Sequence, residues 1–104
     1  MITILARFRV QPGKEREAEE AIRAMAAAVE AHEPGALAYV FHRSQQDPSE
    51  ITVFELYADA EAASAHGQTA HMSQLRAAFA TVFEPGSVKI ERLERLAGFV
   101  RPGP

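Results

Sequence analysis

The sequence of 104 residues contains no cysteine. Its absence excludes a disulfide scaffold, a thiolate nucleophile, a thiolate-bound zinc ion and an iron–sulfur cluster. An excess of positive charge is also absent: the formal net charge is −3 at pH 7, so no overall positive field exists to hold nucleic acid. No apolar run approaches the roughly 20 residues that cross a bilayer. These absences predict a protein that binds neither nucleic acid nor a membrane.

What the chain does have is the composition of an ordinary globular domain, with 47% hydrophobic and 24% charged residues. A chain of this length has room for one domain with one core. We expect that domain to span residues 1–96, followed by a loosely held tail over residues 97–104, where no hydrophobic period is present. No basic leader precedes the apolar N-terminal stretch, so we expect a cytoplasmic location.

The pattern of apolar residues predicts four β-strands. The first and the last, over residues 2–10 and 87–93, alternate regularly between apolar and polar side chains. Two further runs, rich in β-branched and aromatic residues, lie over residues 36–43 and 50–57. A polar turn that contains Pro48 joins these two runs, which predicts a hairpin.

Helical periodicity fills the segments between the strands. Residues 14–32 carry apolar side chains at helical spacing, and the helix must end where a proline follows. Asp59 is placed to cap a short helix through Ala65, and a second helical face runs from Met72 to Phe83. The resulting order, β-α-β-β-α-β, predicts an α+β fold of the ferredoxin-like type with a four-stranded antiparallel sheet.

Both faces of this sheet are predicted to be apolar. Helices cover one face of such a sheet, so the other should be polar if it meets water. Instead, the two middle strands carry apolar residues on both sides, with Leu37, Tyr39 and Phe41 opposite Ala36, Ala38, Val40 and His42, and with Ile51 and Val53 opposite Phe54 and Leu56. We therefore predict a homodimer that packs two sheets face to face and buries well over ~1,200 Å². The alternative is a monomer whose long side chains shield the outer face.

Glu55 and Tyr57 form the first candidate site, because residues two apart on a strand point to the same face. A carboxylate on an apolar face has its charged form destabilised by desolvation unless a partner supports it. The helical region after the hairpin supplies two imidazoles for that purpose, His66 and His71. The alternative is purely structural, with Glu55 in a buried pair with an arginine or a histidine and Tyr57 in the core.

The histidines do not have the spacing of a metal site. His66 and His71 are five residues apart, which is the wrong spacing for two ligands on one helical face. His32 stands at the end of a helix, which favours a histidine, and His42 belongs to a surface or an interface. Since a glycine-rich nucleotide loop is missing as well, we expect neither a metal ion nor another cofactor.

Several segments resemble the antibiotic biosynthesis monooxygenase family of small dimeric α+β barrels. The resemblance runs from residue 2 to residue 95 and rests on the segments 6–15, 33–39, 42–44, 47–48, 54–59, 65–66 and 69–72. The last three segments match the family pattern E-x-W-x-D, which begins here at Glu55, followed by A-H-x-x-S/T-x-H, which ends here at His71. Tyr57 departs from the pattern because it replaces a tryptophan, which makes the pocket wall smaller and adds a hydroxyl.

This resemblance implies a homodimer of ferredoxin-like subunits, each with a pocket between sheet and helices. Family members include monooxygenases that oxidise aromatic quinols or anthrones without metal or flavin, and relatives that degrade haem or isomerise small signalling molecules. The haem-degrading branch has an asparagine on the first strand and a histidine on the second helix. This sequence has Ala6 and Arg76 at those places, so the resemblance disfavours haem.

We therefore predict a cofactor-independent monooxygenase that acts on dioxygen and a small hydrophobic aromatic quinol, phenol or anthrone-like substrate. An electron-rich phenol can react with dioxygen once it is deprotonated, so the site needs a base, a hydrogen-bond donor and a dry pocket. We assign His71 as the base and Glu55 as the group that supports an imidazole. Tyr57 and His66 are assigned to position the substrate or its oxyanion. The competing hypothesis is a non-catalytic dimeric module that binds a hydrophobic small molecule or is associated with stress.

Overall fold

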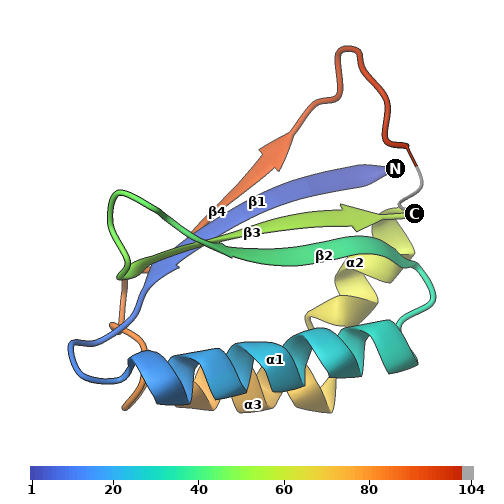
Figure 1. Ribbon diagram of the computed structural model, residues 1–104. Coiled ribbons are helices and arrows are strands. Elements are labelled where there is room, and N and C mark those ends of the chain that lie inside the picture. The colour runs from blue at the N-terminus through green and yellow to red at the C-terminus, as the bar shows by residue number, and fades with distance from the viewer. Residues whose placement is uncertain (102–104) are drawn as a thin grey trace.

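A four-stranded antiparallel sheet forms one layer of the molecule, and helices form the other (Figure 1). The computed structural model describes residues 1–101. Its strands lie in the order β2-β3-β1-β4 and comprise β1 (Ile2–Arg9), β2 (Ala36–Arg43), β3 (Glu50–Tyr57) and β4 (Lys89–Leu93). One face of the sheet is covered by the helices α1 (Glu15–His32), α2 (Ala60–His66) and α3 (Ala70–Ala78). The predicted α+β fold of the ferredoxin-like type is confirmed.

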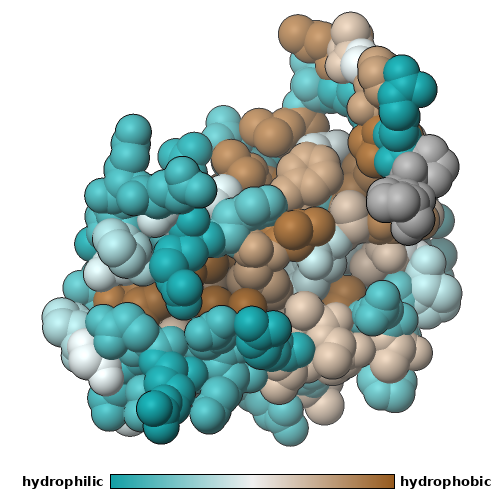
Figure 2. Space-filling view, viewed as in Figure 1, coloured by the Kyte–Doolittle hydropathy of each residue, from teal (hydrophilic) through white to brown (hydrophobic). Residues whose placement is uncertain are grey.

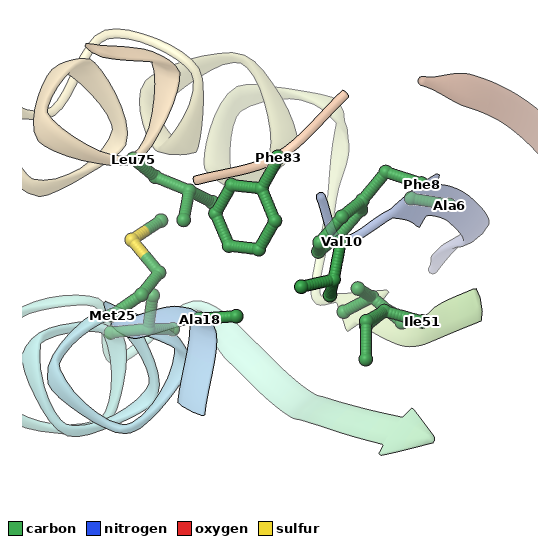
Figure 3. Close-up of a cluster of buried hydrophobic side chains, with 10 residues drawn as sticks. Ala6, Phe8, Val10, Ala18, Met25, Ile51, Leu75 and Phe83 are labelled. Carbon is green, nitrogen blue, oxygen red and sulfur yellow. The ribbon is translucent and has the colours of Figure 1, made fainter. Parts of the chain in front are cut away.

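The core fills the space between the sheet and the helices. Alternate residues of β1 and β3 point into it, and α1 adds its apolar stripe through Met25 and Val29. Leu75 from α3 and Phe83 from the segment that follows α3 complete the cluster around Phe8 (Figure 3). Full burial of one large apolar side chain stabilises a fold by about 1.5–3 kcal/mol, so this cluster is a main source of stability.

The opposite face of the sheet has no helix over it. Leu5, Phe54 and Leu56 project from the central strands on this side. From the edge strands, Val40 is 46% exposed and Leu93 is 38% exposed. Figure 2 shows apolar surface over the sheet, whereas the surface of α1 is hydrophilic. The two middle strands therefore carry apolar side chains on both faces, as predicted. Toward its rim the outer face is polar, with Arg7, His42, Lys89 and Glu91 on the same side.

A β-bulge at the start of β2 changes one predicted face. Ala36 and Ala38 pair with successive residues of β3, so Leu37 is left over in the bulge and is 54% exposed. Ala36 consequently packs on the core together with Tyr39 and Phe41. The prediction that Leu37 shares a face with Tyr39 and Phe41, and Ala36 the opposite face, is therefore wrong. A bulge adds one residue to a strand and reverses the alternation beyond it.

The second predicted helical face extends too far along the chain. α3 ends at Ala78 rather than at Phe83, because the chain turns back toward β1. The backbone N–H of Gln11 donates to the carbonyl oxygen of Val82, and Phe83 forms an isolated bridge with Val10. The sequence predicts that the first strand ends at Val10, but Val10 forms this isolated bridge instead, so β1 ends one residue earlier, at Arg9.

The last strand begins two residues later than the sequence predicts. The Ser87 hydroxyl accepts a hydrogen bond from the backbone N–H of Arg9 and donates one to the carbonyl oxygen of Glu84. A hydroxyl that bonds the backbone in this way competes with the strand ladder. Regular pairing therefore starts only at Lys89.

The segment after β4, residues 94–101, contains no helix or strand. Its apolar side chains Leu96, Phe99 and Val100 are exposed. Of the tail expected over residues 97–104, the last three residues lie outside the described part of the chain, so the domain boundary at residue 96 stays a prediction. No helix among residues 1–101 has both the length and the apolar character that crossing a bilayer requires.

Candidate functional site

A cavity of about 560 Å³ lies between the sheet and the helices α2 and α3. All four strands contribute to its wall, which is mostly apolar and includes Ile4, Ala6, Phe41, Val53, Met72, Leu75, Phe79, Val88 and Ile90. Val88 and Ile90 are 43% and 68% exposed, so the cavity opens beside β4. Pockets for small molecules commonly enclose about 300–1,000 Å³, and this cavity falls within that range.

Glu55 places a carboxylate in the cavity wall, where its residue is only 8% exposed. β3 carries Tyr57 on the same face, and the Tyr57 hydroxyl donates a hydrogen bond of 2.6 Å to Glu55 Oε1. The predicted pairing of these two residues on one face is therefore confirmed. Burial raises the pKa of Glu55 above its ordinary value, against the opposing effects of the Tyr57 hydroxyl and His66. Burial and the bond to Glu55 also raise the pKa of Tyr57, which therefore stays a donor at neutral pH.

His66 is the imidazole that the structure brings to this pair. It is the last residue of α2, is 7% exposed and lines the cavity. Its Nε2 lies 4.0 Å from Glu55 Oε1. The centre of its ring lies 5.3 Å from that of Tyr57 and 5.1 Å from that of Tyr39. His66 thus faces a carboxylate and two aromatic rings.

Local capping decides where α2 ends and α3 begins. The Asp59 carboxylate accepts a hydrogen bond from the first turn of α2. The Thr69 hydroxyl accepts from the backbone N–H of Met72 at 3.1 Å and donates to the carbonyl oxygen of His66 at 2.9 Å. One threonine therefore caps α3 and holds the end of α2, which sets the positions of His66 and His71 on the two sides of the joint.

Glu33 is a candidate residue that the sequence analysis missed. It directly follows α1, and its side chain is 10% exposed. Two imidazoles contact its carboxylate: His66 Nδ1 lies 3.0 Å from Oε1, and His71 Nε2 lies 2.5 Å from Oε2. The one signal in the sequence was the place of Glu33 at the C-terminal end of a helix, where the macrodipole disfavours a carboxylate unless donors offset it.

His71 contacts Glu33 rather than Glu55. No hydrogen bond or ion pair joins His71 to Glu55 in the part of the chain that the structure describes. Instead, His71 lines a smaller hollow of about 140 Å³ between α1 and α3, and its ring stacks on that of His32 with centroids 6.4 Å apart. Two of the four predicted site residues, Glu55 and His66, thus line the large cavity. Tyr57 does not line it but bonds Glu55, and His71 is connected to His66 through Glu33.

Tyr39 and Phe41 both line the large cavity. Alternation alone left open whether they belong to a pocket wall or to a dimer face. Burial, together with the carboxylates of Glu55 and Glu33, raises the pKa of the Tyr39 hydroxyl. The Tyr39 hydroxyl is therefore protonated at neutral pH and can act as a hydrogen-bond donor.

Ala6 and Arg76, the two positions at which the expected haem-binding residues are missing, also line the cavity. The Arg76 guanidinium donates a hydrogen bond of 2.6 Å to the carbonyl oxygen of Gly67. Over residues 1–101, no three His, Cys, Asp or Glu side chains are grouped so that they could hold a metal ion.

Comparison with known proteins gives a family match over most of the chain. The family model for antibiotic biosynthesis monooxygenase matches residues 1–78. A proposed antibiotic biosynthesis monooxygenase from Caulobacter crescentus is 35% identical, with 92% of this chain and 90% of that chain covered and a TM-score of 0.84. A protein from Pseudomonas aeruginosa is 28% identical over 92% of this chain and 94% of its own, with a TM-score of 0.82. No curated protein matches the sequence.

Similarity of fold extends to lower identity. A proposed antibiotic biosynthesis monooxygenase from Bacteroides thetaiotaomicron is 19% identical and has a TM-score of 0.85. The comparison covers 98% of this chain and 95% of that chain. At this identity the likeness shows a shared fold alone.

Proposed function

Because the chain belongs to the antibiotic biosynthesis monooxygenase family, we propose that it oxidises a small aromatic quinol, phenol or anthrone-like substrate with dioxygen, without a cofactor. The observation that supports this most directly is the placement of Glu55, His66 and Tyr39 in the wall of a mostly apolar cavity. The apolar wall suits an aromatic ring, and the three polar side chains suit a phenolic hydroxyl.

The chemistry asks for a deprotonated substrate. Dioxygen reacts slowly with closed-shell organic molecules, but the anion of an electron-rich phenol can pass an electron to it. When a methylene of the anthrone type is oxidised, one oxygen atom becomes the carbonyl oxygen, and the other leaves as water with the two hydrogens. The substrate supplies all the electrons, so the protein has to take a proton, bind the oxyanion and exclude water.

We assign the proton acceptor to His66. Its Nε2 lies 4.0 Å from Oε1 of Glu55, which also lines the cavity, so Glu55 stabilises the imidazolium that forms. Tyr57 does not line the cavity and instead positions Glu55 through its 2.6 Å hydrogen bond. Tyr39 is the donor for the developing oxyanion.

His71, which the sequence analysis assigned as the base, has a supporting role in this proposal. A base must lie within hydrogen-bond reach of the proton that it takes. The Nε2 of His71 contacts Glu33, and its side chain lines the hollow between α1 and α3 rather than the large cavity. These contacts are the reason for moving the base to His66.

Oxygen uptake with a panel of quinols and anthrones tests the proposal, with heat-inactivated protein as the background. We expect uptake with at least one compound and a loss of turnover of about 10²–10⁴-fold in His66→Asn, the usual effect of losing a positioned base. Asparagine can still donate to Glu33 where Nδ1 does, but nothing replaces Nε2. His42→Asn is the matched control, because His42 is exposed on β2 and bonds the carbonyl oxygen of Thr52.

Two results would contradict these assignments. Full turnover of His66→Asn on a confirmed substrate would remove His66 as the base and return the role to His71. Saturable binding of a panel compound with no oxygen uptake would favour the competing hypothesis, a non-catalytic module that binds a hydrophobic small molecule.

We further propose that the protein is a homodimer that pairs through the outer face of its sheet. Support comes from the apolar residues on that face, where Leu5 and Phe54 lie beside the exposed side chains of Val40 and Leu93. A face of this kind needs a cover to be stable in water. The cytoplasmic location stays a prediction.

A further inference from the structure

We propose that Glu33 is a positioning residue that fixes His66 in the tautomer with its proton on Nδ1 and leaves Nε2 unprotonated toward the cavity. The inference rests on the proposed role of His66 as the base. It is carried by one arrangement, in which two imidazoles from different helices meet on one carboxylate that is 10% exposed.

The directions of the hydrogen bonds around Glu33 follow from its chemistry. An ionised carboxylate accepts hydrogen bonds and cannot donate them. His66 Nδ1 lies 3.0 Å and 3.1 Å from its two oxygens, and His71 Nε2 lies 2.5 Å from Oε2. Both of these nitrogens must therefore carry a proton. In neutral His66, the other ring nitrogen, Nε2, then holds the free lone pair.

The surroundings of Nε2 leave that lone pair available. Glu55 Oε1 is 4.0 Å away, which is too long for a direct hydrogen bond, and it already accepts from the Tyr57 hydroxyl. The other neighbours of the imidazole are the aromatic rings of Tyr39 and Tyr57. A hydroxyl of a molecule in the cavity is therefore the natural partner of Nε2, and it would meet an acceptor rather than an N–H.

His71 supports Glu33 rather than His66. Glu33 stands at the C-terminal end of α1, where the macrodipole disfavours a negative charge. The N–H of His71 offsets this cost and fixes the orientation of the carboxylate. Loss of His71 should therefore leave the tautomer of His66 unchanged, whereas loss of Glu33 should not.

Long-range proton–nitrogen correlation NMR of the full chain with isotope-labelled histidine reports which ring nitrogen carries the proton. At a pH where His66 is neutral, we expect the proton on Nδ1 in the wild type and in His71→Ala. In Glu33→Ala the acceptor is gone, and the proton should move to Nε2 or become shared between the two sites. Glu30→Gln is the matched control, because Glu30 is exposed on the same helix, and it should change nothing.

Glu33→Gln tests the same point while it keeps the shape of the side chain. An amide has one oxygen that accepts, and its nitrogen only donates. The variant therefore keeps one accepting oxygen and places a donor at the other position, which weakens the hold of residue 33 on the Nδ1 proton of His66. On a confirmed substrate, Glu33→Ala should lower kcat in proportion to the lost Nδ1 tautomer, toward the roughly 10²–10⁴-fold of a lost base where the proton moves fully to Nε2. KM should stay nearly unchanged because Glu33 does not line the cavity.

Two spectra would overturn the inference: a wild-type His66 with its proton on Nε2, or a folded Glu33→Ala with the wild-type tautomer. The wild-type spectrum decides the assignment even if Glu33→Ala does not fold. Since the spectra need no substrate, they are independent of oxygen uptake. The Nδ1 tautomer in a protein without uptake would count against the proposed function and leave the hydrogen-bond assignment in place.

Discussion

Gly35 directly precedes β2 and lies against Ala62 of α2, and Gly35→Ala should weaken the fold. A Cβ atom at this position would lie 2.6 Å from the Cβ of Ala62, whereas ordinary contacts begin near 3.4 Å. The two elements must therefore separate by about 0.8 Å. The carbonyl oxygen of Gly35 is held by the backbone N–H of Ala58 at 2.9 Å, so α2 has to move, and His66 moves with it.

The size of the effect follows from the cost of overpacking. Inserting an atom into a well-packed site typically costs about 1–3 kcal/mol. For a domain of roughly 60–100 residues, each 1 kcal/mol lowers the Tm by about 4–8 °C. Thermal and urea unfolding of Gly35→Ala should therefore show a Tm lower by at least about 4 °C. Gly67→Ala is the control, because its φ is −65° and a Cβ there would meet its nearest neighbour at 3.6 Å.

A second substitution separates the clash from other effects. Ala62→Gly removes the atom that Gly35→Ala would strike, at a cost of about 1 kcal/mol for a glycine inside a helix. The double variant should be more stable than the sum of the two single effects predicts, by about the overpacking cost of 1–3 kcal/mol. Strict additivity of the two substitutions, or an unchanged Tm in Gly35→Ala, would refute the steric reasoning.

Two further predictions concern assembly and pH. Sedimentation at micromolar concentration should give twice the chain mass of 11.4 kDa, and a species of 11.4 kDa would contradict the homodimer. Because burial raises the pKa of Glu55 above its usual 4.5, Glu55 keeps its proton to higher pH in the folded state than in the unfolded state. The free energy of unfolding should thus fall as the pH rises from 4.5 through the raised pKa, and urea titrations of Glu55→Gln should lack this fall. Tyr57→Phe removes a donor that lowers the pKa of Glu55, so in this variant the fall in the free energy of unfolding should extend to higher pH. An unchanged pH profile would contradict the role of the Tyr57 hydroxyl.

Most of the fold is visible in local patterns, because alternation and turn chemistry act over a few residues. β3 is an example, since Ile51, Val53 and Glu55 lie on one face as their spacing predicts. The errors arise where distant segments compete with the local pattern. The early end of α3 depends on a bond between Gln11 and Val82, which no short window of sequence contains.

The candidate site was predictable only in the part that one strand builds. Glu55 and Tyr57 are two residues apart, so strand geometry alone brings them together. Which of His66 and His71 reaches the cavity depends on how α3 is oriented relative to α2, and local sequence patterns do not predict that orientation. Glu33 is 33 residues away from His66 along the chain and meets it only because α1 and α2 pack beside the same end of the sheet.

The caps at the joint between α2 and α3 have a consequence for how this protein can diverge. Thr69 and Glu33 hold the two imidazoles, and neither of them lines the large cavity. The shape of the cavity is set by other positions, among them Val53 and Met72. Mutations that reshape the cavity therefore need not move the imidazoles, so descendants of one ancestor can acquire new ligands while they inherit the same polar cluster. A library randomised at the apolar wall positions would sample that variation directly.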